Sequence, residues 1–226
     1  MKIKIPNTEH EFTIKKGNKK PIPPFVWIGS MQSSTECISR KKKLCEIGEN
    51  CYALVYEQNP IMYKTVECRA KDEEAIDYMV EHHMSQWFAE ELIKRNNRAK
   101  KHKMQYFRWN ESGDCKTLDH FIFVDEVAEI LHEKLGVISV IYTHRRGLWE
   151  QFRKIRNSRW LIVNGSGFMA DNNFKAVNEF SNQNKNCSSN CEKCFEDDEY
   201  YCYNIDNIGQ TIEEIYRKRK VNKFAR

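Results

Sequence analysis

The sequence has no long hydrophobic run, and none of its apolar stretches approaches the roughly 18 residues that a membrane-spanning helix needs. Its first residues, Met1 to Pro6, contain alternating lysine and isoleucine and lack the apolar core of a secretory signal. The sequence also has no internal repeat and no long low-complexity segment. We therefore expect a protein without a membrane partner that acts in the cytoplasm.

The composition does not favour disorder, because 40% of the 226 residues are hydrophobic and 12% are aromatic. The balance of 37 basic and 32 acidic residues gives a net charge of +5, which permits contact with a polyanion but does not establish it. Four runs are locally basic: Lys15–Lys20, Arg40–Lys43, Arg95–Lys103 and Arg217–Arg226. Each run fits a solvated face, and each also suits a nucleic acid or a nucleotide as a partner.

The number of cysteines is odd, at nine, and without a secretory signal a disulfide framework is a poor explanation for them. Seven of the nine fall into two clusters within polar, turn-rich sequence. The first cluster is Cys37, Cys45 and Cys51, and the second is Cys187, Cys191, Cys194 and Cys202. Thiolates at short spacing suit a soft metal ion or an iron–sulfur cluster. We therefore expect Cys-rich metal-binding loops.

Short apolar strands alternate with helices along most of the chain. A β-hairpin and a basic linker are expected over residues 1–24, followed by strands at 25–28, 104–109, 137–142 and 160–163. Helices are expected at 72–100 with Asp72 as N-cap, at 118–135 ended by Gly136, at 148–155 and at 172–180. A capping box at Thr211 predicts a basic C-terminal helix.

This alternation predicts an α/β fold, either a partial (βα) barrel or an open parallel sheet. Residues 25–182 would form that unit, and residues 183–226 would form a Cys-rich metal-binding segment with the basic helix. Ligands of parallel sheets bind at the carboxyl ends of the strands. The loops at that edge begin at Gly29, Asn110, Thr143 and Asn164, and the first of them carries the N-terminal cysteines.

Three thiolates in the first loop could hold three irons of a [4Fe–4S] cluster and leave the fourth iron open to a chelating ligand. The basic residues Arg40–Lys43 would lower the pKa of these thiols. The alternative is a structural zinc site that uses the same three cysteines and one partner, for example Cys68.

Four short motifs follow one another along the chain: Cys45-x5-Cys51-Tyr52-Ala53, Arg108-x3-Ser112-Gly113-Asp114, Ile141-Tyr142-Thr143-His144-Arg145 and the late cysteine cluster. In this order they resemble the motifs of the phage gene-product-eighty-eight family and, more distantly, of the radical S-adenosylmethionine superfamily. The resemblance covers roughly residues 25–202. If a phage encodes the chain, the cytoplasm in which we expect it to act is that of the host.

The resemblance implies a partial barrel with an iron–sulfur cluster in the loop after the first strand and S-adenosylmethionine as a second cofactor. Ser112, Gly113 and Asp114 occupy the place of the turn that contacts the methionine amino group in that superfamily. A glycine there permits close backbone approach, and a carboxylate suits an ammonium. Tyr52 would lie near the adenine. The implied activity is radical chemistry, and the basic runs favour a nucleotide or a nucleic acid as its substrate.

The cysteine spacing departs from the superfamily pattern of Cys-x3-Cys-x2-Cys after the first strand. That spacing occurs here only at Cys187, Cys191 and Cys194, which predicts an auxiliary cluster or a zinc site in the late segment. The competing hypothesis is therefore a zinc-stabilised protein that binds a nucleic acid or a host protein and keeps the barrel only as a scaffold.

Overall fold

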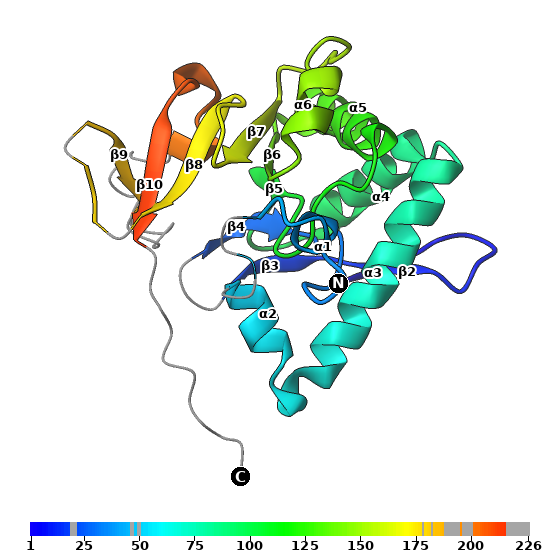
Figure 1. Ribbon diagram of the computed structural model, residues 1–226. Coiled ribbons are helices and arrows are strands. Elements are labelled where there is room, and N and C mark those ends of the chain that lie inside the picture. Colours follow the sequence, from blue (N-terminus) through cyan, green and yellow to red (C-terminus); the bar gives the residue numbers. More distant parts are fainter. Residues whose placement is uncertain are drawn as a thin grey trace.

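The computed structural model describes residues 1–18, 22–45, 48, 51–177, 179–181, 183–187, 195 and 201–215. These residues form an α/β protein with an eight-stranded, mostly parallel sheet and a separate antiparallel hairpin (Figure 1). The strands are β1 (Lys2–Lys4), β2 (Glu11–Thr13), β3 (Lys15–Asn18), β4 (Ile22–Ile28), β5 (Tyr106–Arg108), β6 (Ile138–Thr143), β7 (Leu161–Ser166), β8 (Asn172–Val177), β9 (Lys185–Cys187) and β10 (Thr211–Ile215). The helices are α1 (Ile38–Lys41), α2 (Tyr52–Glu57), α3 (Tyr63–Glu81), α4 (Ser85–Arg98), α5 (Leu118–Leu135) and α6 (Arg146–Phe152), with 3-10 turns η2 (Pro60–Met62), η3 (Tyr201–Tyr203) and η4 (Ile205–Asn207).

The N-terminal hairpin is confirmed, since β1 pairs antiparallel with β2 and Ile3 lies opposite Phe12. The expected linker after it is instead a pair of strands, because β3 and β4 pair antiparallel across a bulge next to Gly17. Gly17 has a φ of +62°, and a Cβ on it would lie 2.5 Å from the carbonyl oxygen of Ile22. Only glycine fits this close approach at a positive φ, which explains why a basic, proline-containing stretch can form a strand pair.

The order of the large sheet is β3-β4-β5-β6-β7-β8-β10-β9. The strands β4 to β8 lie side by side in chain order and all run parallel, as the alternation of strands and helices predicts. In this arrangement each carboxyl end faces the same edge of the sheet. The loops that follow β4, β5 and β6 therefore meet at one edge.

The expected long helix over residues 72–100 is wrong, because two helices occupy this part of the chain. The break falls at His82–Met84, where His83 adopts a φ of +51°. Asp72 is not an N-cap but lies in the middle of α3, where its carboxylate accepts the backbone N–H of Thr13 at 2.6 Å. This bond joins α3 to the hairpin.

The helix expected at 172–180 is wrong, since Asn172–Val177 form β8. The expected C-terminal helix is wrong at its start, since Thr211–Ile215 form β10, and the rest of it lies outside the described residues. The two strands pair parallel, with Ile212 opposite Phe174. The capping-box pattern of Thr211 and Glu214 is overridden because both residues lie in a strand that pairs with β8 and β9. The carboxylate of Glu213 between them accepts the N–H of Ser181 and the amide of Asn184, each at 2.7 Å. Pairing on both sides of β10 outweighs a local helix signal.

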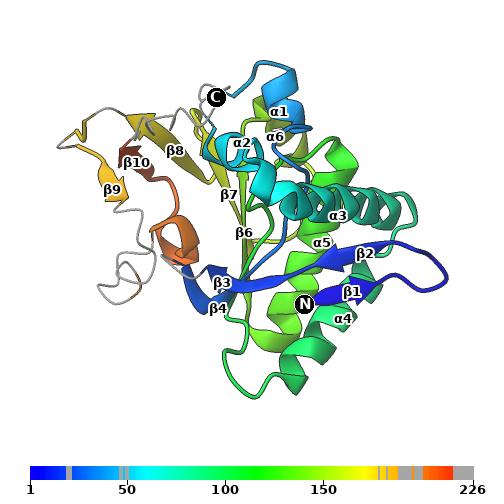
Figure 2. The same ribbon diagram turned by 90° about the horizontal axis from the view of Figure 1, so that it is seen from below.

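The two faces of the sheet are covered differently. Figure 2 shows α3, α4 and α5 on one side of β6 and β7. The core on that side includes Trp27, Phe107, Ile141 and Val163. The opposite face buries Val26, Ile28, Val140 and Ile162, and there Tyr203 and Phe195 cover the strands in place of helices. Successive strand residues alternate between the two cores, as the pleat requires.

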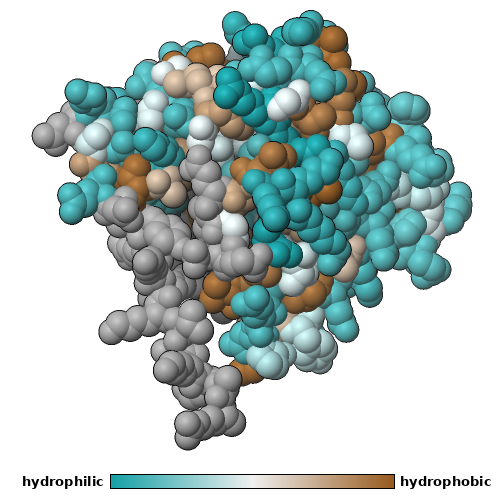
Figure 3. All heavy atoms as spheres, in the orientation of Figure 1, coloured by the Kyte–Doolittle hydropathy of each residue, from teal (hydrophilic) through white to brown (hydrophobic). Residues whose placement is uncertain are grey.

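The surface seen in Figure 3 is mostly hydrophilic, with apolar side chains in small scattered groups. None of the helices in the described ranges is long and apolar enough to cross a membrane.

Candidate metal and cofactor site

The loops after β4 and β5 are joined by backbone hydrogen bonds at the carboxyl edge of the sheet. The N–H of Gly29 donates to the carbonyl of Arg108 at 2.9 Å, and the N–H of Met31 donates to the carbonyl of Ser112 at 3.1 Å. The N–H of Trp109 donates to the carbonyl of Val140 at 2.9 Å, which connects the second loop to β6. The expectation that these loops meet is therefore confirmed.

Asp114 is the centre of this edge, and it is only 2% exposed. Its carboxylate accepts the hydroxyl of Ser39 at 2.6 Å and the hydroxyl of Thr143 at 2.7 Å. It also accepts the backbone N–H groups of His144 and Cys115, each at 2.8 Å. One side chain thus binds the Cys-containing loop after β4 to the end of β6.

Gly113 packs against the loop after β4. It has a φ of +83°, and a Cβ on it would lie 2.5 Å from the backbone nitrogen of Gln32. The hydroxyl of Ser112 donates to the carbonyl of Gln32, while the side-chain oxygen of Gln32 accepts the N–H of Ile38 at 3.2 Å. The Ser112-Gly113-Asp114 turn and the cysteine loop form one packed unit.

This packing bears on the cofactor role that the resemblance implies for Ser112, Gly113 and Asp114. A carboxylate offers about four acceptor positions, and four described donors already bind the carboxylate of Asp114. An ammonium group could bind there only if one of these donors left. The turn as it stands does not fit an ammonium clamp. The side chain of Tyr52 lies outside the described residues, although its backbone begins α2.

The first cysteine cluster lies in the loop after β4. Cys37 directly precedes α1, Cys51 directly precedes α2, and the N–H of Cys45 donates to the carbonyl of Ser39 at 3.3 Å. All three are half-buried, and none of them forms a disulfide in the structure. The donors therefore share one loop that Asp114 holds through Ser39.

Burial raises the pKa of the Cys37 thiol to about 11, and the nearby Asp114 and Cys45 act in the same direction. The backbone amides of Arg40 and Ser39 oppose this shift without reversing it. The expectation that Arg40–Lys43 lower the pKa is thus wrong for Cys37. The physical reason is that burial of the Cys37 thiol outweighs the contributions that lower its pKa.

The second cysteine cluster is described only in part. Cys187 lies in β9, and Cys202 lies in η3, where its carbonyl accepts the amide of Asn164 at 3.1 Å. Cys191 and Cys194 lie outside the described residues. Within the described ranges, no group of three or more His, Cys, Asp or Glu side chains is close enough to hold a metal ion. Metal binding at either cluster stays a prediction.

Sequence reasoning missed a buried ion network that supports the cysteine loop. The carboxylate of Glu57 accepts the backbone N–H of Ser34 at 2.8 Å and that of Thr35 at 3.2 Å. Arg69 donates to Glu57 and, at 3.0 Å, to Glu111 in the loop after β5. These partners are far apart in the chain and have no shared motif, so only the tertiary structure reveals them.

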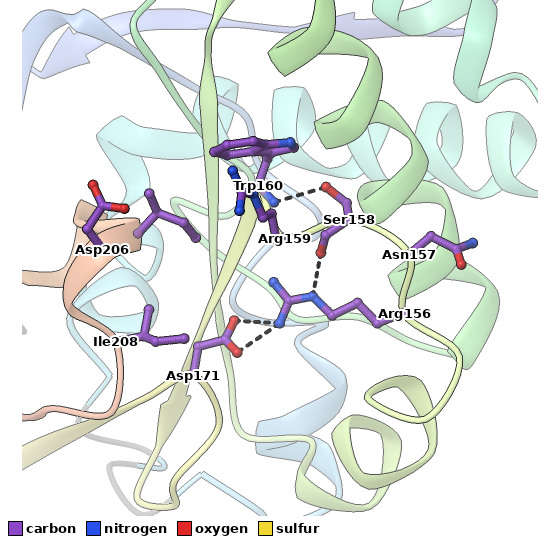
Figure 4. A pocket seen from close by; sticks show the side chains of 9 residues that line it. Arg156, Asn157, Ser158, Arg159, Trp160, Asp171, Asp206 and Ile208 are labelled. Carbon is purple, nitrogen blue, oxygen red and sulfur yellow. Dashed lines mark hydrogen bonds and ion pairs between the residues drawn. The ribbon is translucent and has the colours of Figure 1, made fainter.

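A separate surface cavity of about 420 Å³ lies next to the start of β7 (Figure 4). At its base Arg156 pairs with both carboxylate oxygens of Asp171 at 2.8 Å. Arg159 lies 4.2 Å from the centre of the Trp160 ring. None of the cysteines lines this cavity.

Comparison with known proteins finds no match among family models, curated proteins or solved structures. The resemblance therefore depends on the motifs of the sequence alone.

Proposed function

We propose that this chain is an iron–sulfur protein with a scaffold of the radical S-adenosylmethionine type. The observation that carries the proposal is the position of the first cysteine cluster. It lies in the loop after β4, the first of five parallel strands that are adjacent in chain order, and at the edge where such sheets bind ligands. The strands β4 to β8 would form part of a (βα) barrel.

In this proposal Cys37, Cys45 and Cys51 hold three irons of a [4Fe–4S] cluster. Such a cluster supplies one-electron transfer when it is bound. Asp114 holds the loop through Ser39, and Glu57 holds it through Ser34 and Thr35. Since the pKa of Cys37 is about 11, binding releases a proton from this thiol, and we expect the affinity to rise with pH.

The substrate in this proposal is a nucleotide or a nucleic acid, which the basic runs favour. S-adenosylmethionine binding by Asp114 is not part of it, because the acceptor positions of that carboxylate are filled by protein donors.

A second candidate is a zinc-stabilised binding protein without catalysis, in which Cys187, Cys191, Cys194 and Cys202 hold the zinc. One observation favours it. Tyr203, which is 1% exposed, and Phe195 cover the sheet face that would line the interior of a barrel. A substrate could not lie on the part of the face that these side chains occupy.

The test is the metal and sulfide content of protein purified without oxygen, together with a visible spectrum. Iron, acid-labile sulfide and absorbance near ~400 nm support the iron–sulfur proposal. The signal should vanish in the variant Cys37→Ser/Cys45→Ser/Cys51→Ser and persist in Cys68→Ser, whose half-buried thiol donates to Thr13 instead. Colourless protein with zinc supports the second candidate, and protein with neither metal contradicts both.

A further inference from the structure

Two of the basic runs come together at a turn next to the amino end of β5. We name residues Arg98 to Lys103 the basic turn. It begins at the last residue of α4, and all of its residues except Ala99 are exposed. The sequence from Leu92 to Asn110 contains no acidic residue, so the turn has no carboxylate of its own.

The basic turn is held in place by buried groups. The side-chain oxygen of Asn96 accepts the N–H of Met104 at 2.7 Å, and the indole N–H of Trp27 donates to the carbonyl of His102 at 3.2 Å. His102 adopts a φ of +54°, and the backbone turns sharply at this residue. The turn therefore presents its charges from a fixed backbone rather than from a free tail.

Trp27 also brings a second basic run to the turn. The ammonium of Lys16, on β3, lies 4.7 Å from the centre of the Trp27 ring. Since the same indole donates to His102, Lys16 lies near the basic turn although the two are far apart in sequence. Lys16 of the first basic run and the basic turn are thus parts of one surface.

The cations of the basic turn differ in their ion pairing from many other cations of the protein. Lys15, Lys41, Lys94 and Lys116 each pair with a carboxylate. Within the described part of the chain, no ion pair involves Arg98, Lys100, Lys101 or Lys103. Cations in the last turn of a helix interact favourably with its dipole, which accounts for Arg98. The helix dipole does not account for the three lysines that follow the helix.

We propose that the basic turn, with Lys16, binds the phosphodiester backbone of a nucleic acid. Exposed lysines and arginine without acidic partners neutralise phosphates and release counterions. The contacts would be to phosphates, so binding would not depend on base sequence. This inference is independent of the metal site, because no cysteine takes part in it.

The composition of the turn favours a nucleic acid over two other anionic partners. A membrane-binding segment inserts an apolar face, whereas Met104 is buried, and the exposed residues on either side of the turn, Asn97 and Gln105, are polar. A protein interface has an apolar centre and is depleted in lysine. Neither description fits a turn in which lysine predominates.

The test measures fluorescence anisotropy of labelled duplex DNA and duplex RNA of about 20 base pairs, as a function of salt. The variant is Lys100→Gln/Lys101→Gln/Lys103→Gln. The matched control is Lys4→Gln/Lys71→Gln/Lys175→Gln, which removes the same charge from exposed lysines on β1, α3 and β8. The side chains are exposed, so both variants should keep the circular dichroism of the parent protein.

We expect the turn variant to bind at least about tenfold more weakly and to lower the slope of log K against log salt by about 3, while the control stays close to the parent. Equal weakening in both variants would show that net charge, not the turn, binds the probe. Absence of binding by the parent protein overturns the proposal. So does tighter binding to vesicles that contain phosphatidylserine, if the turn variant loses that binding and leaves the oligonucleotide binding unchanged.

Discussion

The carboxylate of Asp114 and the hydroxyl of Ser39 are 2.6 Å apart although 75 residues separate them in the sequence. Through this bond the turn after β5 holds the loop that carries Cys37 and Cys45. Ser39 is fully buried, so the bond is shielded from water. Asp114 thus has a structural role that the resemblance to a cofactor clamp does not include.

Replacing Asp114 should therefore destabilise the fold. In Asp114→Ala two hydroxyls and two backbone N–H groups lose their acceptor, and we expect a loss of about 3 kcal/mol or more in the free energy of unfolding. Ser39→Ala removes one of these bonds and should cost about 1 to 2 kcal/mol. Urea unfolding measures both values. An Asp114→Ala protein as stable as the parent would contradict the structural role and restore the clamp hypothesis.

Gly113 provides a test of the packing between the two loops. Gly113→Ala places a methyl group 2.5 Å from the nitrogen of Gln32 at a φ of +83°, so we expect a marked loss of stability and looser packing of the cysteine loop. Gly136→Ala is the matched control. It has a φ of +69° but nothing within 4 Å of the added carbon, so only the backbone strain of about 1 to 2 kcal/mol should appear.

The difference between these two variants is measured by urea unfolding and by hydrogen exchange of the amides in residues 30–45. A larger loss for Gly113→Ala, with faster exchange in the loop, is the expected result. If both variants lose the same free energy of unfolding, the contact between the added methyl group and Gln32 does not affect stability.

Helices and strands that are determined by nearby residues of the chain were predictable from the sequence. The helix α5 begins at Leu118 and ends at Leu135 as predicted, because its apolar period is continuous and Gly136 adopts the left-handed conformation of a C-cap. The parallel strands were also predictable from their short apolar runs. The break between α3 and α4 was not, since His83 takes a positive φ without a glycine or proline to indicate it.

Elements whose conformation depends on distant partners could not be predicted. Thr211 to Glu214 has the sequence of a capping box, yet β8 and β9 pair with it on both sides and make it a strand. The candidate site, too, could be predicted from the sequence only in part. The alternation of strands and helices predicted that the loops after β4 and β5 would lie at one edge of the sheet. The bonds of Asp114 to Ser39 and Thr143, however, join residues with no common pattern in the sequence.

Asp72 should make stability depend on pH. Burial raises the pKa of its carboxyl to about 7, although the backbone N–H of Thr13 opposes the shift. An unfolded aspartate has a pKa of about 3.9, so between that value and 7 the folded chain binds the proton that the unfolded chain has released. This contribution is fully present below about pH 4 and is lost as pH rises to about 7, by at most about 4 kcal/mol.

The measurement compares urea unfolding of the parent and of Asp72→Asn from about pH 4.5 to 8. The neutral amide should remove the decline in stability over this range, while the control Asp119→Asn, at an exposed position on α5, should keep it. Parallel pH profiles for the parent and Asp72→Asn would show that Asp72 does not titrate in this range.

The pair of Glu57 and Arg69 offers the strictest test of how the cysteine loop is supported. The side chain of Glu57 is 0% exposed and that of Arg69 is 6% exposed. Burial alone would raise the pKa of Glu57, but hydrogen bonds from Arg69 and Ser34 hold it below its usual range. Arg69→Met leaves this carboxylate buried without its cation, and we expect a loss of about 3 to 5 kcal/mol.

Glu57→Gln in the same chain should recover much of that loss, because the amide oxygen of glutamine can still accept the N–H groups of Ser34 and Thr35 and carries no charge to desolvate. A double-mutant cycle by urea unfolding measures this coupling, for which we expect at least about 1 kcal/mol. A coupling near zero would mean that the two side chains contribute independently. Glu57 would then hold the loop through Ser34 and Thr35 without help from Arg69, and Arg69→Met should leave the hydrogen exchange of the loop unchanged.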